Sequence, residues 1–169
     1  MSVTTPDLGD MRRTGDTVEI TFHRRYARPI EKVWAALTVP ERIADWFAEV
    51  EALDLRLGGA IHLSFPGDHS KIRGVVTAYD PPRRLTWTWP QTDGTESTVT
   101  FDLEPDGDGC RLTLTERGLT LSQGAGNAAG WHAHLEAMED AVDGVRTSWA
   151  TLLAREKVVN QVYKDRAPA

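Results

Sequence analysis

The chain has one cysteine, Cys110, in 169 residues, so no disulfide can form within it. It also lacks any apolar run near the roughly 18–20 residues that a membrane helix needs, and its first residues contain no hydrophobic stretch typical of a secretion signal. An unpaired thiol suits a reducing compartment. We therefore expect a cytoplasmic protein.

Positive charge is scarce and is not concentrated in any segment. The chain carries 19 Lys and Arg residues against 25 Asp and Glu, which gives a formal net charge of −6. Proteins that bind nucleic acids need a basic patch to neutralise phosphates. The sequence therefore predicts a small molecule or another protein as the partner, and neither nucleic acid nor membrane.

The common signatures of cofactor chemistry are absent from the sequence. There is no G-x-S-x-G elbow, no phosphate-binding glycine loop and no dinucleotide fingerprint. Residues 106–109, DGDG, resemble the start of a calcium loop, but Arg117 occupies the twelfth position, where that loop needs a glutamate. Cys110 has no histidine linked to it in sequence and is expected to be an ordinary, semi-buried thiol. We expect no cofactor.

The histidines near residue 132 do not predict a metal site. In a helix, His132 and His134 point about 200° apart and cannot easily bind one ion together. His132 and Glu136 share a face, where we expect a solvated pair. His134 lies beside an apolar stripe, and we expect it to pack there, with a catalytic base as the alternative.

Apolar and polar residues alternate along six segments, as they do in half-buried strands. The apolar positions are Val18, Ile20 and Phe22; Leu53, Leu55 and Leu57; Ile61, Leu63 and Phe65; Leu85, Trp87 and Trp89; Val99, Phe101 and Leu103; and Leu112 and Leu114. Residues 71–79 predict a further strand whose inward face the pattern leaves open. One apolar and one polar face are typical of an antiparallel sheet covered on a single side.

Apolar residues at three- and four-residue steps predict three helices. Two short helices follow the first strand, one opening at Arg28-Pro29 and one at Pro40. A long C-terminal helix is expected from about Trp131 to Leu153, after a loop at residues 122–127. Its apolar stripe consists of Trp131, Leu135, Met138, Val142, Val145, Trp149 and Leu152. Gly144 weakens this helix and is expected to mark a bend or a close approach.

This order of elements predicts one α+β domain, in which a curved antiparallel sheet of about six to seven strands packs on the long C-terminal helix. A hydrophobic content of 40% suits one globular core. We assign the domain to residues 16–156. Residues 1–15 are polar and aperiodic and are expected to form a flexible tail, and residues 157–169 a frayed one.

Four phrases of the chain resemble the START-like, helix-grip (SRPBCC) superfamily, and within it the subfamily related to the activator of the heat-shock protein 90 ATPase. They are RPIEKVWAAL at 28–37, PERIADWF at 40–47, YDPPRRL at 79–85 followed by Thr88-Trp89, and Gly130-Trp131 followed by Leu135. The superfamily includes lipid carriers, hormone receptors, polyketide cyclases and co-chaperone domains. The fold alone therefore does not select a function.

The helix-over-sheet arrangement and six tryptophans favour a cavity that carries or senses a small hydrophobic or aromatic molecule. We expect no enzyme, and a monomer or homodimer. The pocket residues expected are Trp34, Trp46, Phe47, Trp87, Trp89, Phe101, Trp131, Leu135 and Met138. The subfamily implies an alternative, a co-chaperone-like, protein-binding module with a role in stress response. A polyketide-cyclase-like or hydrolytic enzyme that uses the cavity is a third possibility.

The free-energy cost of an empty space in a protein core limits how large such a cavity can be. An empty, dry void of roughly 300 Å³ would cost about 7 kcal/mol, so we expect the pocket to be open to water, occupied or partly collapsed. The parity of Leu112 and Leu114 continues to Glu116, which predicts an inward carboxylate if the strand stays regular. Because strand ends splay, we favour a solvated end at this position. Glu116 and His134 are the only catalytic candidates.

Overall fold

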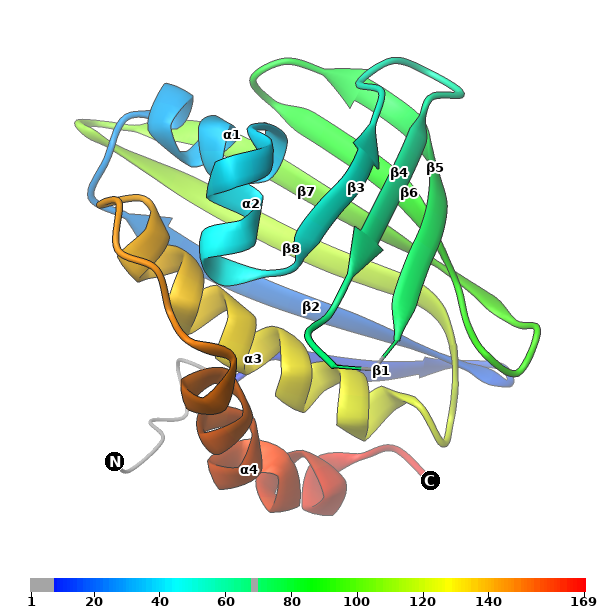
Figure 1. Ribbon diagram of the computed structural model, residues 1–169. Coiled ribbons are helices and arrows are strands. Elements are labelled where there is room, and N and C mark those ends of the chain that lie inside the picture. Colours follow the sequence, from blue (N-terminus) through cyan, green and yellow to red (C-terminus); the bar gives the residue numbers. More distant parts are fainter. Residues whose placement is uncertain (1–7, 68–69) are drawn as a thin grey trace.

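The computed structural model describes residues 8–67 and 70–169. Within them, eight strands and four helices follow one another along the chain (Figure 1). The strands are β1 (Asp10–Thr14), β2 (Thr17–Tyr26), β3 (Glu49–Leu53), β4 (Ala60–Ser64), β5 (Lys71–Asp80), β6 (Arg84–Pro90), β7 (Glu96–Asp106) and β8 (Gly109–Thr120). The helices are α1 (Ile30–Thr38), α2 (Pro40–Trp46), α3 (Gly124–Ala141) and α4 (Trp149–Arg166). None of these helices is long and apolar enough to cross a membrane.

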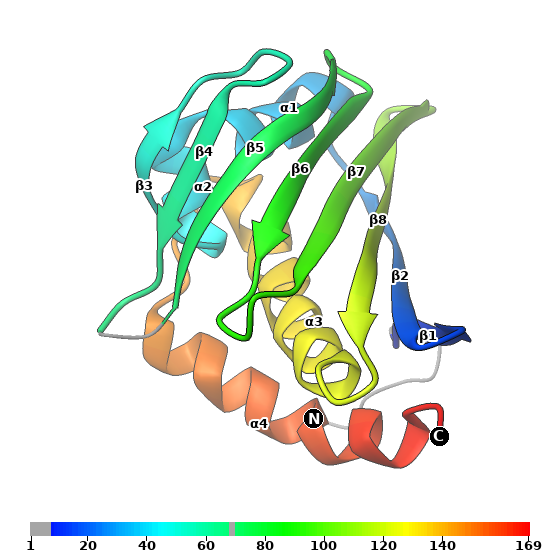
Figure 2. The ribbon, with the colours of Figure 1, turned by 90° about the vertical axis from the view of Figure 1, so that its right-hand side faces the viewer.

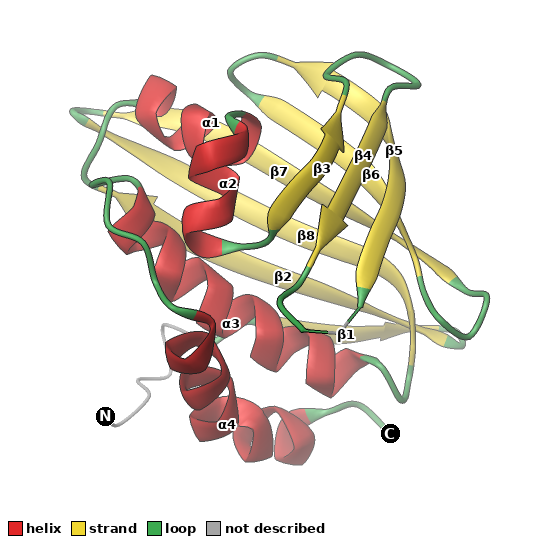
Figure 3. Ribbon diagram, viewed as in Figure 1, coloured by secondary structure: helices red, strands yellow, loops and turns green. Residues whose placement is uncertain are grey.

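The strands form one antiparallel sheet in the order β1-β2-β8-β7-β6-β5-β4-β3. The last strand, β8, lies between β2 and β7 and pairs with both, so the end of the sheet-forming part of the chain lies beside its beginning. The sheet curves around α3, and all the described helices lie on its concave side (Figures 2 and 3). This is the α+β arrangement that the sequence predicted, with one strand more than expected.

The core between the sheet and α3 follows the predicted alternation. On β7, Val99, Phe101 and Leu103 are buried, whereas the side chains between them face outward. The residues of α3 that meet this inner face are buried as well, including Trp131, Leu135 and Met138. Each large side chain buried in this way contributes roughly 1.5–3 kcal/mol. Most of the space under α3 is therefore filled by the protein itself.

The C-terminal helix differs from the prediction. The sequence predicted one helix from Trp131 to Leu153, but α3 begins at Gly124, inside the expected loop, and ends at Ala141. Gly144 has a φ of 80°, a left-handed conformation that glycine adopts without strain, and the chain turns there before α4. Val145, assigned to the apolar stripe, is instead 56% exposed. The bend expected at Gly144 is thus confirmed, and it divides the helix in two.

Both predicted tails are wrong where the structure describes them; residues 1–7 lie outside the described part. Residues 10–14 form β1, which pairs with β2, and α4 continues to Arg166. The two segments also meet, because the hydroxyl of Tyr163 accepts a hydrogen bond from the backbone nitrogen of Gly9 at 2.8 Å. β1 is an edge strand with mostly exposed side chains, so the alternation rule could not detect it.

Two strand assignments also change. β3 ends at Leu53, and Leu57, expected to be an inward strand residue, is 71% exposed in the turn before β4. The open question of residues 71–79 is settled by β5, on which Ile72, Gly74 and Val76 are buried. The alternating leucines at 53, 55 and 57 suggested a strand, but Leu55 and Leu57 lie in the loop between β3 and β4.

Candidate functional site

A pocket of about 320 Å³ lies where the N-terminal half of α3, the first turns of α4 and the sheet come together, and it opens to solvent on one side. Its lining consists of Phe47, Phe65, Ser70, Trp89, Gly126, Asn127, Gly130, Trp131, His134, Trp149, Leu153 and Glu156. The opening to water agrees with the limit that the cost of an empty cavity imposes. We regard this pocket as the candidate site.

Helical spacing brings the lining residues of α3 to one side. Asn127, Gly130, Trp131 and His134 follow at steps of three, one and three residues, which places them on one helix face. A Cβ atom added at Gly130 would have no neighbour within 4 Å. The missing side chain at this position leaves room for the pocket.

α4 forms the opposite wall in the same way. Trp149, Leu153 and Glu156 are spaced by four and three residues and face α3 across the opening. The turn at Gly144 is what allows α4 to lie beside α3 (Figure 2). One continuous helix would have no second wall.

Aromatic rings support one another around the pocket. Phe47 stacks on Trp131 with ring centroids 5.1 Å apart, and Phe65 stacks on Trp89 at 6.4 Å. Trp89 and Trp131 meet edge to face at 6.0 Å, and Phe65 lies 5.8 Å from Trp149. Such ring pairs contribute about 0.5–1.5 kcal/mol each beyond the area that they bury. The aromatic wall is thus formed before any ligand arrives.

A buried carboxylate lies behind this wall. Glu116, on β8, is 0% exposed and accepts hydrogen bonds from Ser97 Oγ at 2.7 Å and from Trp131 Nε1 at 2.7 Å. The side-chain amide of Asn127 donates to both of its oxygens, at 3.2 and 3.3 Å. Burial raises the pKa of Glu116, and these hydrogen bonds counter part of the rise.

Glu116 therefore points inward, as the parity of β8 predicted, and the solvated strand end that we favoured is wrong. It does not itself line the pocket. Instead it holds Asn127 and Trp131, which do line it. The carboxylate of Glu116 fixes the side chains of Asn127 and Trp131, and it has no contact with the pocket space itself.

His134 is a packing residue, as the sequence predicted. It is 8% exposed, and its Nδ1 lies 2.8 Å from the carbonyl oxygen of Trp46, so Nδ1 carries the proton and donates it. Burial lowers the pKa of His134 to about 4, which keeps the ring neutral at pH 7. Its ring also contacts Phe47 at 5.0 Å.

His132 corrects another expectation. It was assigned to a solvated face with Glu136, yet it is 1% exposed. Its Nδ1 lies 2.9 Å from the hydroxyl of Tyr163, and its Nε2 lies 3.2 Å from Glu136. The reason is α4, which covers this face of α3 and was not foreseen.

Three of the nine predicted pocket residues, Phe47, Trp89 and Trp131, line the pocket. Five others are buried in the core instead: Trp46, Trp87, Phe101, Leu135 and Met138. Trp34 lies away from the site, where it stacks on Tyr79 with centroids 6.0 Å apart. Sequence reasoning missed further lining residues, among them Phe65, Asn127, Trp149, Leu153 and Glu156. It placed Trp149 on a continuous core helix that ended at Leu153, so α4 and its pocket-facing side were not foreseen.

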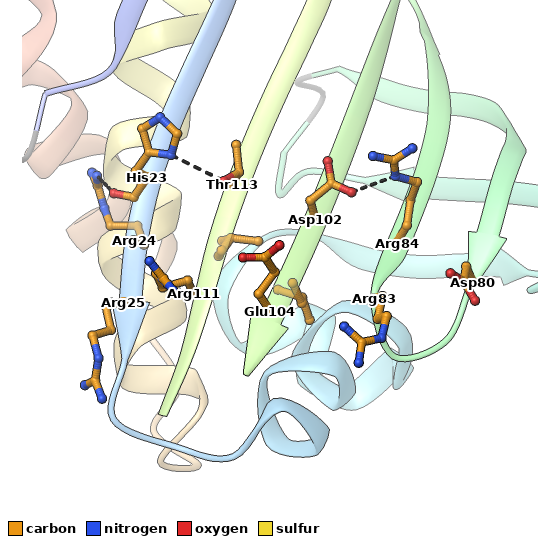
Figure 4. A pocket seen from close by; sticks show the side chains of 12 residues that line it. His23, Arg24, Arg25, Asp80, Arg83, Arg84, Asp102, Glu104, Arg111 and Thr113 are labelled. Carbon is orange, nitrogen blue, oxygen red and sulfur yellow. Dashed lines mark hydrogen bonds and ion pairs between the residues drawn. The ribbon is translucent and has the colours of Figure 1, made fainter. Parts of the chain in front are cut away.

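A larger hollow, of about 790 Å³, lies on the outer face of the sheet (Figure 4). It is lined mainly by charged side chains of β2, β8, β7 and β6. Three of its arginines pair with carboxylates: Arg84 with Asp102 at 2.6 Å, and Arg25 and Arg111 with Asp106 at 2.9 and 3.8 Å. Exposed pairs of this kind contribute about 0–1 kcal/mol and are common on solvated faces. We therefore assign this hollow to the solvated surface of the sheet.

No group of three or more metal-binding side chains occurs in residues 8–67 and 70–169. Cys110 is buried on β8, deeper than the semi-buried thiol expected.

Several solved structures are similar to this chain. CalU16 from Micromonospora echinospora is 25% identical with a TM-score of 0.73, and the match covers 94% of this chain and 95% of CalU16. BPP1335 from Bordetella parapertussis is 28% identical with a TM-score of 0.66, over 98% and 94% of the two chains. DynU16, a protein in the dynemicin biosynthetic locus, is 25% identical with a TM-score of 0.66, over 78% of this chain and 48% of that one.

No curated protein matches the chain. Residues 27–143, however, match the family model described as Activator of Hsp90 ATPase homolog 1-like protein. The matched part runs from the end of β2 past the end of α3 and contains Glu116 and Trp131, whereas α4 lies outside it. The chain therefore belongs to the Activator of Hsp90 ATPase homolog 1-like family, of the START-like superfamily that its sequence resembles.

Proposed function

We propose that the protein binds a small hydrophobic or aromatic molecule in the pocket between α3, α4 and the sheet, as a carrier or sensor. The observation that carries this proposal is the aromatic lining of a pocket of about 320 Å³ that is open to solvent. Ligand sites are typically concave, mostly apolar and of several hundred Å³, with few polar groups. The site fits this description.

The family relationship supports a small molecule as the ligand. Members of the superfamily bind hydrophobic ligands or act as cyclases. DynU16, which resembles this chain, comes from a biosynthetic locus. Both points favour small-molecule binding over the co-chaperone role that the family's name suggests.

The chemistry of the site favours binding over catalysis. Glu116 lies outside the pocket lining, and its oxygens already accept hydrogen bonds from three side chains of the protein. Burial lowers the pKa of His134 to about 4, so its ring is a weak base at pH 7. We therefore propose no reaction. We also propose that the protein is cytoplasmic and that it is a monomer or homodimer.

A substitution that fills the pocket tests this function. Gly130→Leu projects a side chain into the free space beside α3, whereas Gly130→Ala adds one methyl group and serves as the matched control. We expect saturable quenching of tryptophan fluorescence when the wild type and the Ala variant are titrated with fatty acids, polycyclic aromatics and flavonoids. The Leu variant should lose at least tenfold in affinity for any ligand found.

Native mass spectrometry of freshly purified protein gives a second measurement, since a carried ligand adds its mass. The proposal is contradicted if none of the ligand classes binds the wild type, or if the ligand found binds all three proteins equally. Specific capture of a chaperone by a protein that is silent toward ligands would favour the co-chaperone alternative.

A further inference from the structure

We infer that the ligand of this pocket carries a positive charge, such as a tertiary or quaternary ammonium group attached to an apolar or aromatic body. This inference rests on the proposed function and specifies its ligand class. Three features of the pocket support it: the ring faces, the sign of the charged groups, and the orientation of the polar ones.

The first feature is the number of aromatic rings around one small space. Phe47, Phe65, Trp89, Trp131 and Trp149 all line the pocket. Phe47 stacks on Trp131 and Phe65 on Trp89, while Trp89 and Trp131 meet at 90°. The face of an aromatic ring carries partial negative charge and attracts a cation within about 6 Å of its centroid, with tryptophan the strongest. Several aromatic rings around one cavity are typical of sites for quaternary ammonium groups.

The second feature is that the charge of the pocket has one sign. Among its described lining residues there is no Lys or Arg, and the one acid is Glu156. Glu156 is part-buried and makes no hydrogen bond or ion pair within the described part of the chain. Burial raises the pKa of its carboxyl, and no cation of the protein opposes the rise. A bound cation would be its counter-ion.

The third feature is the orientation of the polar groups. The amide nitrogen of Asn127 donates to Glu116, so its carbonyl oxygen, an acceptor, is the group left for a ligand. Glu116 adds a second carboxyl behind the wall formed by Asn127 and Trp131. His134 is held neutral by burial. Apart from the hydroxyl of Ser70, which can donate or accept, these polar groups offer acceptors beside aromatic rings, and this combination suits a cation better than an anion.

Two compounds of the same shape test the inference: phenyltrimethylammonium, which is a cation, and tert-butylbenzene, its neutral counterpart. Both are titrated against wild type, Glu156→Gln and a control, Glu139→Gln, which removes one charge from the exposed side of α3. The readout is quenching of tryptophan fluorescence, checked by calorimetry.

We expect the cation to bind the wild type and the control alike, and Glu156→Gln to bind it about three- to tenfold more weakly. The affinity for tert-butylbenzene should change less than twofold in both variants. If Glu156→Gln affects both compounds equally, or if only the neutral compound binds, the inference is overturned while the proposed function stands. If neither these compounds nor any hydrophobic ligand binds, the proposed function fails with it.

Discussion

At the scale of single residues, Glu116 shows how one buried carboxylate organises a site without lining it. A carboxylic acid that kept its proton would need an acceptor for that proton. The groups around Glu116 are instead donors: the indole nitrogen of Trp131, the amide nitrogen of Asn127 and the hydroxyl of Ser97, which itself receives a hydrogen bond from Gln91 at 3.2 Å. This arrangement matches the ionised form, although burial raises the pKa of the carboxyl.

Glu116→Gln tests this assignment, because glutamine has the same shape but brings an NH₂ group among donors. We expect the free energy of unfolding at pH 7 to fall by about 1–3 kcal/mol, the usual effect of leaving buried polar groups unpaired. Urea unfolding followed by tryptophan fluorescence measures it. Glu104→Gln, on the exposed side of β7, should change stability by less than about 0.5 kcal/mol. A Glu116→Gln variant as stable as wild type would mean that the carboxyl is protonated.

The position of Glu116 could be predicted from the sequence, but its role could not. The alternation of Leu112 and Leu114 leads to an inward side chain at 116, and this parity is correct. Its partners come from β7 and α3, which no local pattern connects to β8. Hydrogen bonds between distant segments follow from tertiary packing, which is why the sequence alone favoured the solvated strand end, wrongly.

At the scale of elements, α4 decides both the pocket and the prediction errors. Its buried residues are Leu152, Val159 and Tyr163, set among many charged residues, so its amphipathic pattern is weak. The central strands and α3 have apolar faces and were predicted for that reason, whereas β1 has mostly exposed side chains and was missed. α4 was merged with α3 because apolar spacing continues across Gly144, and the glycine conformation that separates the helices follows from the fold.

Tyr163→Phe should loosen the contact between α4, α3 and the N-terminal segment. The hydroxyl accepts a hydrogen bond from the buried backbone nitrogen of Gly9 and bonds with Nδ1 of His132, so removing it leaves two buried polar groups without that partner. We expect a loss of about 1–3 kcal/mol. In this variant the amide hydrogen of Gly9 should exchange faster than it does in wild type, whereas the exchange rates of the central strands should stay the same.

Tyr79→Phe is the control, because Tyr79 is 37% exposed, lies on β5 and stacks on Trp34 of α1. It should leave both stability and exchange unchanged. Unaltered protection of the Gly9 amide in Tyr163→Phe would show that packing of the ring alone holds α4 in place.

At the scale of the whole molecule, the curved sheet and α3 form a filled two-layer core, and α4 lies beside α3 (Figure 2). The candidate pocket lies between these helices and the sheet. The net charge of −6 fits the cationic ligand inferred above, since a negative surface attracts cations over distances of about a Debye length. His134 belongs to both the buried core and the lining of the candidate pocket.

His134 therefore predicts how the stability of the whole protein depends on pH. Its pKa is lowered to about 4 in the folded state, against about 6.5 in an unfolded chain, so between these values the unfolded state binds the proton and the folded state does not. The contribution is fully present above pH 6.5 and is lost as pH falls toward 4. Its size is about 3 kcal/mol.

Comparison with His134→Asn isolates this contribution, because the asparagine amide can still donate to the Trp46 carbonyl but does not titrate. Subtraction is needed, since Glu116 acts with the opposite sign: its raised pKa gives stability that is present at low pH and lost as pH rises. We expect the difference in unfolding free energy, wild type minus variant, to fall by about 3 kcal/mol between pH 7 and pH 4. Urea unfolding at several pH values measures it. If the difference is the same at every pH, the pKa of His134 is equal in the folded and unfolded chains. Water would then reach the His134 ring in the folded protein.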